Sequence, residues 1–263
     1  MRVATYNINS IRARASNLLE WLKKENPDIV FLQEIKCETE NFLYFECESL
    51  GYKVAVEGQK SYNGVAILCK YDFEITNRKI PNFDDENARF LEIKVTKNEQ
   101  KFYAISIYAP NGCSNDKNTE KEKLSYKLNW FDKLYERLKD ITTEGLPIII
   151  GGDFNVMMSD LDAYDSIKFK NSPLFIKDVR DKIEGIKYLG LFDSFRLLHP
   201  KDEGYTFWDY TGNSFVTNLG LRIDYLFVSA FWANRIEKVY VDKLLRKMDK
   251  PSDHTALVMD IRD

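Results

Sequence analysis

Residues 148–155 read Ile148-Ile149-Ile150-Gly151-Gly152-Asp153-Phe154-Asn155, an apolar run that passes through two glycines into polar side chains. Three consecutive isoleucines next to glycine are typical of a buried strand, and glycine permits tight turns and close approach of another group. In an extended backbone, Asp153 and Asn155 point to the same side because they are two positions apart. The stretch predicts a buried strand that ends in reactive polar groups, and an Asx turn is the alternative interpretation.

Similar short runs recur along the chain and predict an α/β fold. Most contain four to eight residues, and the expected strands are 3–8, 29–33, 53–56, 65–69, 90–95, 102–108, 147–150, 223–228 and 256–261. Apolar residues at helical spacing predict helices at 15–24, at 120–140 and between 174 and 187. A chain of 263 residues, 44% of them hydrophobic, can bury a large core. We expect a single domain, residues 1–263, of two stacked mixed sheets with helices outside.

Composition narrows the classes of function. The formal net charge of -3 and the sequence pI of about 5.7 argue against nonspecific coating of nucleic acid, which needs many Lys and Arg contacts to phosphate. The four cysteines lack the close pairs of a zinc site and are too sparse for a disulfide framework. The sequence shows neither an apolar run of membrane-spanning length nor a basic N-terminal segment followed by an apolar one. A cytoplasmic protein without membrane contact is expected.

Polar side chains also follow the first two expected strands. Glu34 comes directly after the run 29–33, where a desolvated carboxylate needs a partner such as a cation. Carboxylate oxygens suit Mg²⁺. Asn7 and Asn9 stand two positions apart at the end of the first strand, where they could hold Glu34 or a metal-bound water by hydrogen bonds. A solvated strand end remains the alternative for Glu34.

The pair Asp253-His254, just before the last apolar run, is the sharpest indication of a proton-transfer group. The chain has two histidines, and we interpret the other, His199, as structural. A carboxylate on one ring nitrogen would raise the pKa of His254 and leave the other nitrogen to face a phosphate. Asp253 and Asp224 are both candidates for that carboxylate, although Asp224 could instead form a salt bridge with Arg222.

Tyr108 and Asn111 lie at and just after the end of the run 102–108. A phenol and an amide there could donate hydrogen bonds to phosphate oxygens, although a tyrosine at a strand end ordinarily serves packing. Strands that end in Asp, Glu, Asn, Tyr and His together indicate a site for a hard cation and for proton transfer. Such a site is suited to the hydrolysis of phosphate esters.

These motifs resemble the exonuclease III family of apurinic/apyrimidinic endonucleases. The matching segments are ATYNINSIRAR, PDIVFLQEIK, GYKVAVEGQKSYNGVAIL, ISIYAPNG, PIIIGGDFNV, YTFWDYTGN, LGLRIDYLFVS and KPSDHTALV. The resemblance implies a four-layer α/β sandwich of the DNase I-like type and a Mg²⁺-dependent phosphodiesterase, with one or two ions and Mn²⁺ as an alternative. It implies a monomer that cleaves double-stranded DNA 5′ to abasic sites, with 3′ to 5′ exonuclease and 3′-repair phosphodiesterase activity at blocked 3′ ends.

The resemblance also implies roles for the residues that match its motifs. The implied metal site comprises Asn7, Glu34, Asp153, Asn155, Asp253 and His254. The implied catalytic residues are Tyr108, Asp153, Asn155, Asp224 and His254. Asp153 would position or deprotonate the attacking water. His254, oriented by Asp224, would contact the scissile phosphate.

Substrate binding is implied for Asn9, Arg89, Asn111, Phe207, Trp208, Leu221 and Ile223. In the family, an apolar pocket receives the flipped sugar that lacks a base. The alternative is that Phe207 and Trp208 are core aromatics. Leu221 stands where some relatives carry Trp, which leaves the size of the pocket open.

Two other functions compete with abasic-site cleavage. One is a related metal-dependent phosphodiesterase that acts on RNA, nucleotides or lipid head groups. DNase I-like nucleases, sphingomyelinases and inositol phosphatases resemble this scaffold but place a second His where Tyr108 stands, which favours the abasic-site branch. The other is a silent nucleic-acid-binding module, and it is disfavoured because every implied catalytic position carries a competent residue.

Overall fold

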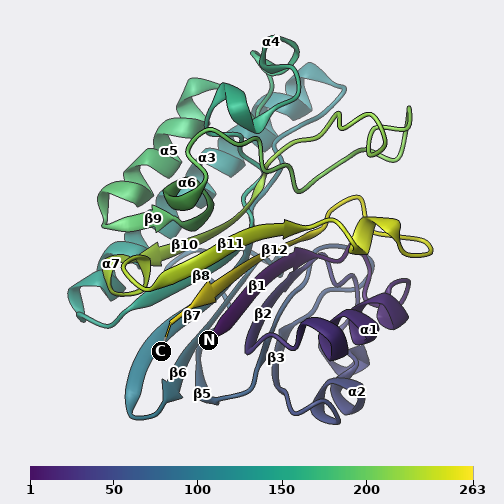
Figure 1. Ribbon diagram of the computed structural model, residues 1–263. Helices are drawn as coiled ribbons and strands as arrows, with labels where there is room; N and C mark the ends of the chain where they lie inside the picture. Colours follow the sequence, from purple (N-terminus) through teal and green to yellow (C-terminus); the bar gives the residue numbers. More distant parts are fainter. Residues whose placement is uncertain (263) are drawn as a thin grey trace.

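The glycine-containing stretch forms β8 (Ile148–Asp153), a central strand of one of two six-stranded sheets. A computed structural model describes residues 1–262, with the two sheets packed against each other and helices on their outer faces (Figure 1). The predicted architecture of two mixed sheets flanked by helices is confirmed. Among residues 1–262, no helix has the length and apolar character that crossing a membrane would require.

Each sheet is built around one parallel pair of strands. The first sheet has the order β11 (Ile236–Asp242), β12 (Ala256–Ile261), β1 (Arg2–Asn7), β2 (Ile29–Gln33), β4 (Val65–Cys69), β3 (Lys53–Glu57). The second has the order β5 (Asp72–Asn77), β6 (Phe90–Lys97), β7 (Gln100–Tyr108), β8, β10 (Asp224–Ser229), β9 (Leu191–Asp193). β1 pairs parallel with β2, and β7 pairs parallel with β8. The carboxyl ends of each pair therefore reach the same edge of their sheet.

Successive residues of the central strands face opposite layers, as the period of two requires. Val3, Ile29 and Phe31 point into the core between the sheets. Ala4 and Tyr6 point to the outer face of the first sheet, where they pack with α1 (Ala15–Glu25). Both faces of these strands are apolar because both are covered.

The helices cover the outer faces of the two sheets (Figure 1). α1 and α2 (Tyr44–Glu48) pack on the first sheet, and α3 (Lys117–Thr143) and α5 (Lys177–Tyr188) pack on the second. The three predicted helices are present, but α3 is longer than predicted because the side chain of Asp116 caps it by accepting a hydrogen bond from Thr119 N. The shorter helices are α4 (Ser166–Phe169), α6 (Ser194–Leu198), α7 (Ala230–Ala233) and the 3₁₀ turns η1 (Thr39–Asn41), η2 (Asp160–Asp162) and η3 (Leu245–Lys247).

The two glycines of the deciding stretch lie within β8 and not in a turn. A Cβ atom on Gly151 would lie 2.3 Å from Cδ2 of Phe31 in the facing sheet. One on Gly152 would lie 2.0 Å from the carbonyl oxygen of Ile107 in β7. Glycine is thus required for close approach, and the strand continues to Asp153, three residues beyond the predicted end.

The strand register places polar side chains in one row. Asp153 at the end of β8 pairs with Tyr108 at the end of β7 and with Asp224 at the start of β10. In the facing sheet, Asn7 ends β1 beside Gln33, the last residue of β2. Because β1 packs against β8 and β2 against β7, these strand ends meet at one edge of the sandwich.

Candidate active site

The amide of Asn7 joins two carboxylates that come from different sheets. Its Nδ2 donates to Glu34 Oε1 at 2.9 Å and to Asp153 Oδ2 at 2.9 Å. Its Oδ1 accepts from the backbone N–H of Asn9. Asn7 therefore holds the carboxylates in place, and its oxygen is engaged within its own loop. The contact predicted between Asn7 and Glu34 is confirmed.

His254 forms a buried pair with Asp224. Nδ1 of the ring lies 2.8 Å from Asp224 Oδ2, which also accepts a 2.6 Å hydrogen bond from the hydroxyl of Thr206. Burial alone would lower the pKa of His254, but the charge and hydrogen bond of Asp224, with Asp153 and Asp253, raise it to about 10. The ring is therefore an imidazolium at neutral pH, and Nε2 lies 3.8 Å from Asp153 Oδ2.

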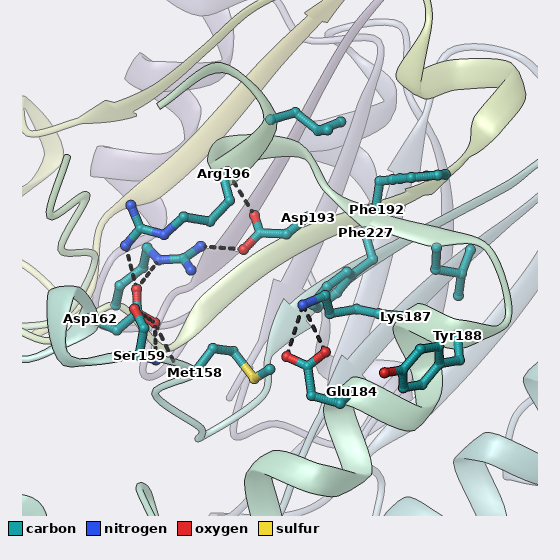
Figure 2. Close-up of a pocket in the computed structure, with 13 residues that line it drawn as sticks. Met158, Ser159, Asp162, Glu184, Lys187, Tyr188, Phe192, Asp193, Arg196 and Phe227 are labelled. Atoms are coloured by element: carbon teal, nitrogen blue, oxygen red, sulfur yellow. Dashed lines mark hydrogen bonds and ion pairs between the residues drawn. The ribbon is translucent and has the colours of Figure 1, made fainter. Parts of the chain in front are cut away.

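The alternative of a salt bridge between Asp224 and Arg222 is wrong. The Arg222 guanidinium turns away from the site and bonds to Asp162 at 2.6 Å and to Asp193 at 2.8 Å. Figure 2 shows Asp162, Asp193 and Arg196 at one side of a cavity of about 490 Å³. This buried network fixes the chain just before β10, and thereby the position of Asp224.

The two carboxylates at the centre have opposite pKa shifts. Burial and the nearby charge of Asp224 raise the pKa of Asp153 to about 7, against the opposing effect of His254. Burial would also raise the pKa of Glu34, but hydrogen bonds from Asn7 and Lys36 and the Lys36 charge lower it. Glu34 is therefore ionised at neutral pH. A bound cation would oppose the rise at Asp153, because it stabilises the charged carboxylate.

The donor atoms fit a hard divalent cation. Single ligand atoms of Glu34, Asp153 and His254 all lie within 4.8 Å of one another. The two carboxylates offer the oxygen ligands that Mg²⁺ prefers. His254 offers the third atom of this cluster, and its predicted role as a ligand would require the ring to release the proton that its raised pKa retains.

Two other predicted ligands form hydrogen bonds beside the site. Asp253 Oδ1 accepts from Asn9 Nδ2 at 2.9 Å. Asn155 donates from Nδ2 to the carbonyl of Ala109 at 2.9 Å, and its backbone N–H bonds to Asp153 Oδ1. Among the described residues, Asp253 does not join the three-residue cluster, whereas the role of Asn155 as a ligand stays a prediction, because these hydrogen bonds use its nitrogen atoms and leave its side-chain oxygen for a cation.

Tyr108 and Arg89 form one wall of the site. The Arg89 guanidinium lies 4.8 Å from the centroid of the Tyr108 ring, and its Nη1 donates to the Tyr108 carbonyl. Burial, then the charges of Glu34 and Asp153, raise the pKa of Tyr108 well above its usual value, so the phenol stays protonated. Both residues line a cavity of about 280 Å³ together with the predicted Asn111 and with Lys123.

The predicted apolar residues divide into two groups. The Phe207 ring lies 4.9 Å from the His254 ring, and Phe207 packs with Leu221 and Ile223 in one apolar cluster. Trp208 is fully buried, and its ring packs against Phe215. Trp208 thus has the burial and packing of the core aromatic in the alternative interpretation, and its contact with substrate stays a prediction.

Three functional neighbours were not predicted from the sequence. Lys36 Nζ lies 2.9 Å from Glu34 Oε2 and donates to Asn9 Oδ1. Thr206 bonds to Asp224, and the Ser252 hydroxyl donates to the Asn7 carbonyl at 2.8 Å. All three lie inside segments that resemble the family's motifs, close in sequence to predicted site residues. That closeness in sequence was the signal that could have identified them.

Comparison with known proteins identifies the family. The model of the Endonuclease/Exonuclease/phosphatase family matches residues 4–254. The chain belongs to this family. It is a phosphodiester hydrolase of the exodeoxyribonuclease III and AP endonuclease group, as the resemblance predicted. The DNase I-like fold is confirmed with it.

Individual relatives match over the full length of the chain. Exodeoxyribonuclease III of Haemophilus influenzae is 34% identical, with 98% of each chain covered. An AP endonuclease from Archaeoglobus fulgidus has a TM-score of 0.92 at 32% identity, and each chain is covered completely. A 3′ phosphatase from Neisseria, bound to a product DNA hairpin, has a TM-score of 0.90 at 32% identity, again with complete coverage of both chains.

Proposed function

We propose that this protein is a Mg²⁺-dependent DNA-repair hydrolase that cleaves the phosphodiester 5′ to abasic sites in double-stranded DNA. Its further activities are 3′ to 5′ exonuclease and 3′-repair phosphodiesterase action at blocked 3′ ends, and it acts as a cytoplasmic, single-domain monomer. The convergence of Glu34, Asp153 and His254 within 4.8 Å carries the proposal. Relatives named exodeoxyribonuclease III and AP endonuclease support it.

Glu34 and Asp153 are the residues that would hold the cation. When bound, Mg²⁺ or Mn²⁺ would supply Lewis-acid stabilisation of phosphate charge and would make a water more acidic. Asn7 keeps the two carboxylates at a fixed spacing by donating to both. Lys36 offsets part of the charge of Glu34.

Asp153 acts on the attacking water, and His254 binds the phosphate. Asp153 is suited to position or deprotonate the attacking water, because its carboxylate borders the proposed cation and a bound cation keeps it ionised. Asn155, whose backbone N–H bonds to Asp153, is placed to orient that water. His254 remains protonated, and its Nε2 is free to donate to a phosphate oxygen while Asp224 holds Nδ1.

Tyr108 and Arg89 lie where the departing 3′ oxygen and its strand would pass. Tyr108 keeps its proton at neutral pH and can donate a hydrogen bond to the oxygen that leaves. Arg89, Asn111 and Lys123 line the adjoining cavity and offer donors for a flanking phosphate. Asn9, held by Asp253 and Lys36 in the loop after β1, offers a further contact to the substrate.

Selectivity for abasic sites would come from the apolar residues beside His254. Phe207, Leu221 and Ile223 form a surface suited to a sugar without its base. A nucleotide that lacks a base has no pairing or stacking to lose when it leaves the duplex.

The deciding experiment uses a labelled duplex that contains one tetrahydrofuran abasic analogue. We expect a single nick 5′ to the lesion with Mg²⁺, and no product when EDTA is present. The matched control is the same duplex with an ordinary nucleotide at that position. Equal cleavage of both duplexes would contradict the abasic-site proposal and would favour a nonspecific phosphodiesterase.

A further inference from the structure

Lys127 on α3 is a lysine without exposed surface. Its Nζ donates to the backbone carbonyl of Asn155 at 2.7 Å and to the backbone carbonyl of Asn111 at 3.1 Å. Burial of a charged or polar group is costly unless its hydrogen bonds are satisfied. The buried amine of Lys127 meets this requirement by donating to two backbone carbonyls in two different loops.

The two carbonyls belong to the loops that follow the central parallel strands. Asn111 lies three residues after the end of β7, and Asn155 lies two residues after the end of β8. Asn155 has a φ of 51°, a left-handed conformation that Asn tolerates better than most residues. Its side chain bonds to the Ala109 carbonyl, so the two loops already touch once. The two hydrogen bonds of Lys127 connect the same loops a second time.

The stem of Lys127 leaves its amine little freedom. Gly112 lies against it, and a Cβ atom there would come within 3.0 Å of both Lys127 Cδ and Pro173 Cβ. Burial lowers the pKa of Lys127 to about 7. Both forms of the amine carry at least two hydrogens, so both carbonyls can be bonded in either protonation state.

We propose that Lys127 is a positioning residue, which sets the distance between the loop that carries Asn111 and the loop that carries Asn155. The proposal rests on the proposed function, because these loops border the site where the phosphate would react. Lys127 does not touch that site itself. Its effect is to keep the Asn155 side chain in a fixed position relative to the segment from Tyr108 to Asn111.

The test compares Lys127→Met with the matched control Lys139→Met, an exposed lysine on the same helix. Methionine keeps the apolar stem and removes both hydrogen bonds. We expect kcat on the abasic duplex to fall by about 10²-fold, as misplacement by about 1 Å can cost. KM should change less than kcat, and Lys139→Met should match the wild type in both. Lys127→Gln, one bond shorter, should also lose kcat and provides the same comparison if the methionine variant does not fold.

Epistasis separates positioning from a merely structural role. If Lys127 acts by placing Asn155, the loss of kcat caused by Lys127→Met should largely disappear in an Asn155→Ala background. Wild-type kcat in the folded Lys127 variants, or the full loss in both backgrounds, would overturn the proposal. The wild-type rate on the abasic duplex decides the proposed function separately. The kcat of each Lys127 variant relative to the wild type is measured on whichever DNA substrate the wild type cleaves, including a duplex with a blocked 3′ end.

Discussion

The contact with Asp224 explains why His254 is ionised. Asp224 is fully buried, and within residues 1–262 its Oδ1 has no hydrogen-bond partner, whereas its Oδ2 bonds to Thr206 and His254. The same contact explains why the pKa of His254 rises despite complete burial of the ring.

Removal of the Asp224 charge should therefore change how His254 titrates. In Asp224→Asn, measured in EDTA, we expect the pKa of His254 to fall from about 10 toward or below 6.5, because burial is then opposed only by Asp153 and Asp253. The raised pKa of the wild type means that the pair stabilises the fold fully below pH 6.5. That contribution is lost as the pH rises to about 10. NMR titration of the two histidine rings and urea unfolding at several pH values measure both effects.

Asp202→Asn is the control for this titration. Asp202 lies 2.9 Å from Nδ1 of His199, the other histidine, so its removal should change the His199 signal and leave His254 as in the wild type. A His254 titration that is the same in Asp224→Asn and in the wild type would disprove the pairing as the cause of the shift.

The element that organises the site is β8. It runs parallel to β7 and antiparallel to β10, so Tyr108, Asp153 and Asp224 occupy one row across three strands. The close approach of β7 and of the facing sheet leaves no room for side chains at the two glycines before Asp153. The position of Asp153 thus depends on the close packing of β8 against its neighbours at Gly151 and Gly152.

Replacement of one of these glycines should destabilise the protein. In Gly152→Ala, the new Cβ would meet the Ile107 carbonyl oxygen at 2.0 Å, and backbone of a paired strand cannot move aside cheaply. We expect the free energy of unfolding to fall by about 1–3 kcal/mol or more. Gly185→Ala in α5 is the control, because its nearest neighbour would be 3.7 Å away, and alanine in a helix should add up to about 1 kcal/mol. Urea denaturation measures both, and changes of the same sign would contradict this account.

The sequence predicted the elements whose pattern is local. Apolar runs that end in polar residues identified β2 and β8, and with them Glu34 and Asp153. It did not predict β5 or β11, where most side chains are at least partly exposed, or β9, which has three residues. None of these strands has an apolar run long enough to stand out from its neighbours.

Contacts that depend on the folded register could not be predicted from local pattern. Thr206 reaches Asp224 across 18 residues, and Lys127 looks in the sequence like any other lysine of a charged helix. Its burial follows from the packing of α3 against the two loops, which helical spacing does not specify. The complete burial of Trp208 could not be predicted for the same reason, because its sequence neighbour Phe207 contacts His254 at the site.

At the scale of the whole molecule, the site joins the two sheets. Asn7 and Glu34 follow β1 and β2 of the first sheet, whereas Asp153 and Asp224 belong to β8 and β10 of the second. The site gathers carboxylates in a chain that is already negatively charged overall, so it attracts cations and repels a DNA backbone. A bound cation would remove that repulsion and at the same time connect the sheets.

Cation binding should therefore raise the stability of the whole protein. At 100 times its dissociation constant, Mg²⁺ should add about 2.7 kcal/mol to the free energy of unfolding, or roughly 5–10 °C in Tm for a chain of this size. In Glu34→Gln, we expect this gain to be lost, because one of the two carboxylate ligands is replaced by a neutral amide. Without Mg²⁺ the variant should be somewhat less stable than the wild type, because the lowered pKa of Glu34 means that its ionised form stabilises the fold through Asn7 and Lys36. Thermal unfolding across a Mg²⁺ titration, with Lys139→Met as the unaffected control, measures this. An equal Mg²⁺ gain in Glu34→Gln and in the wild type would place the cation away from the junction of the sheets.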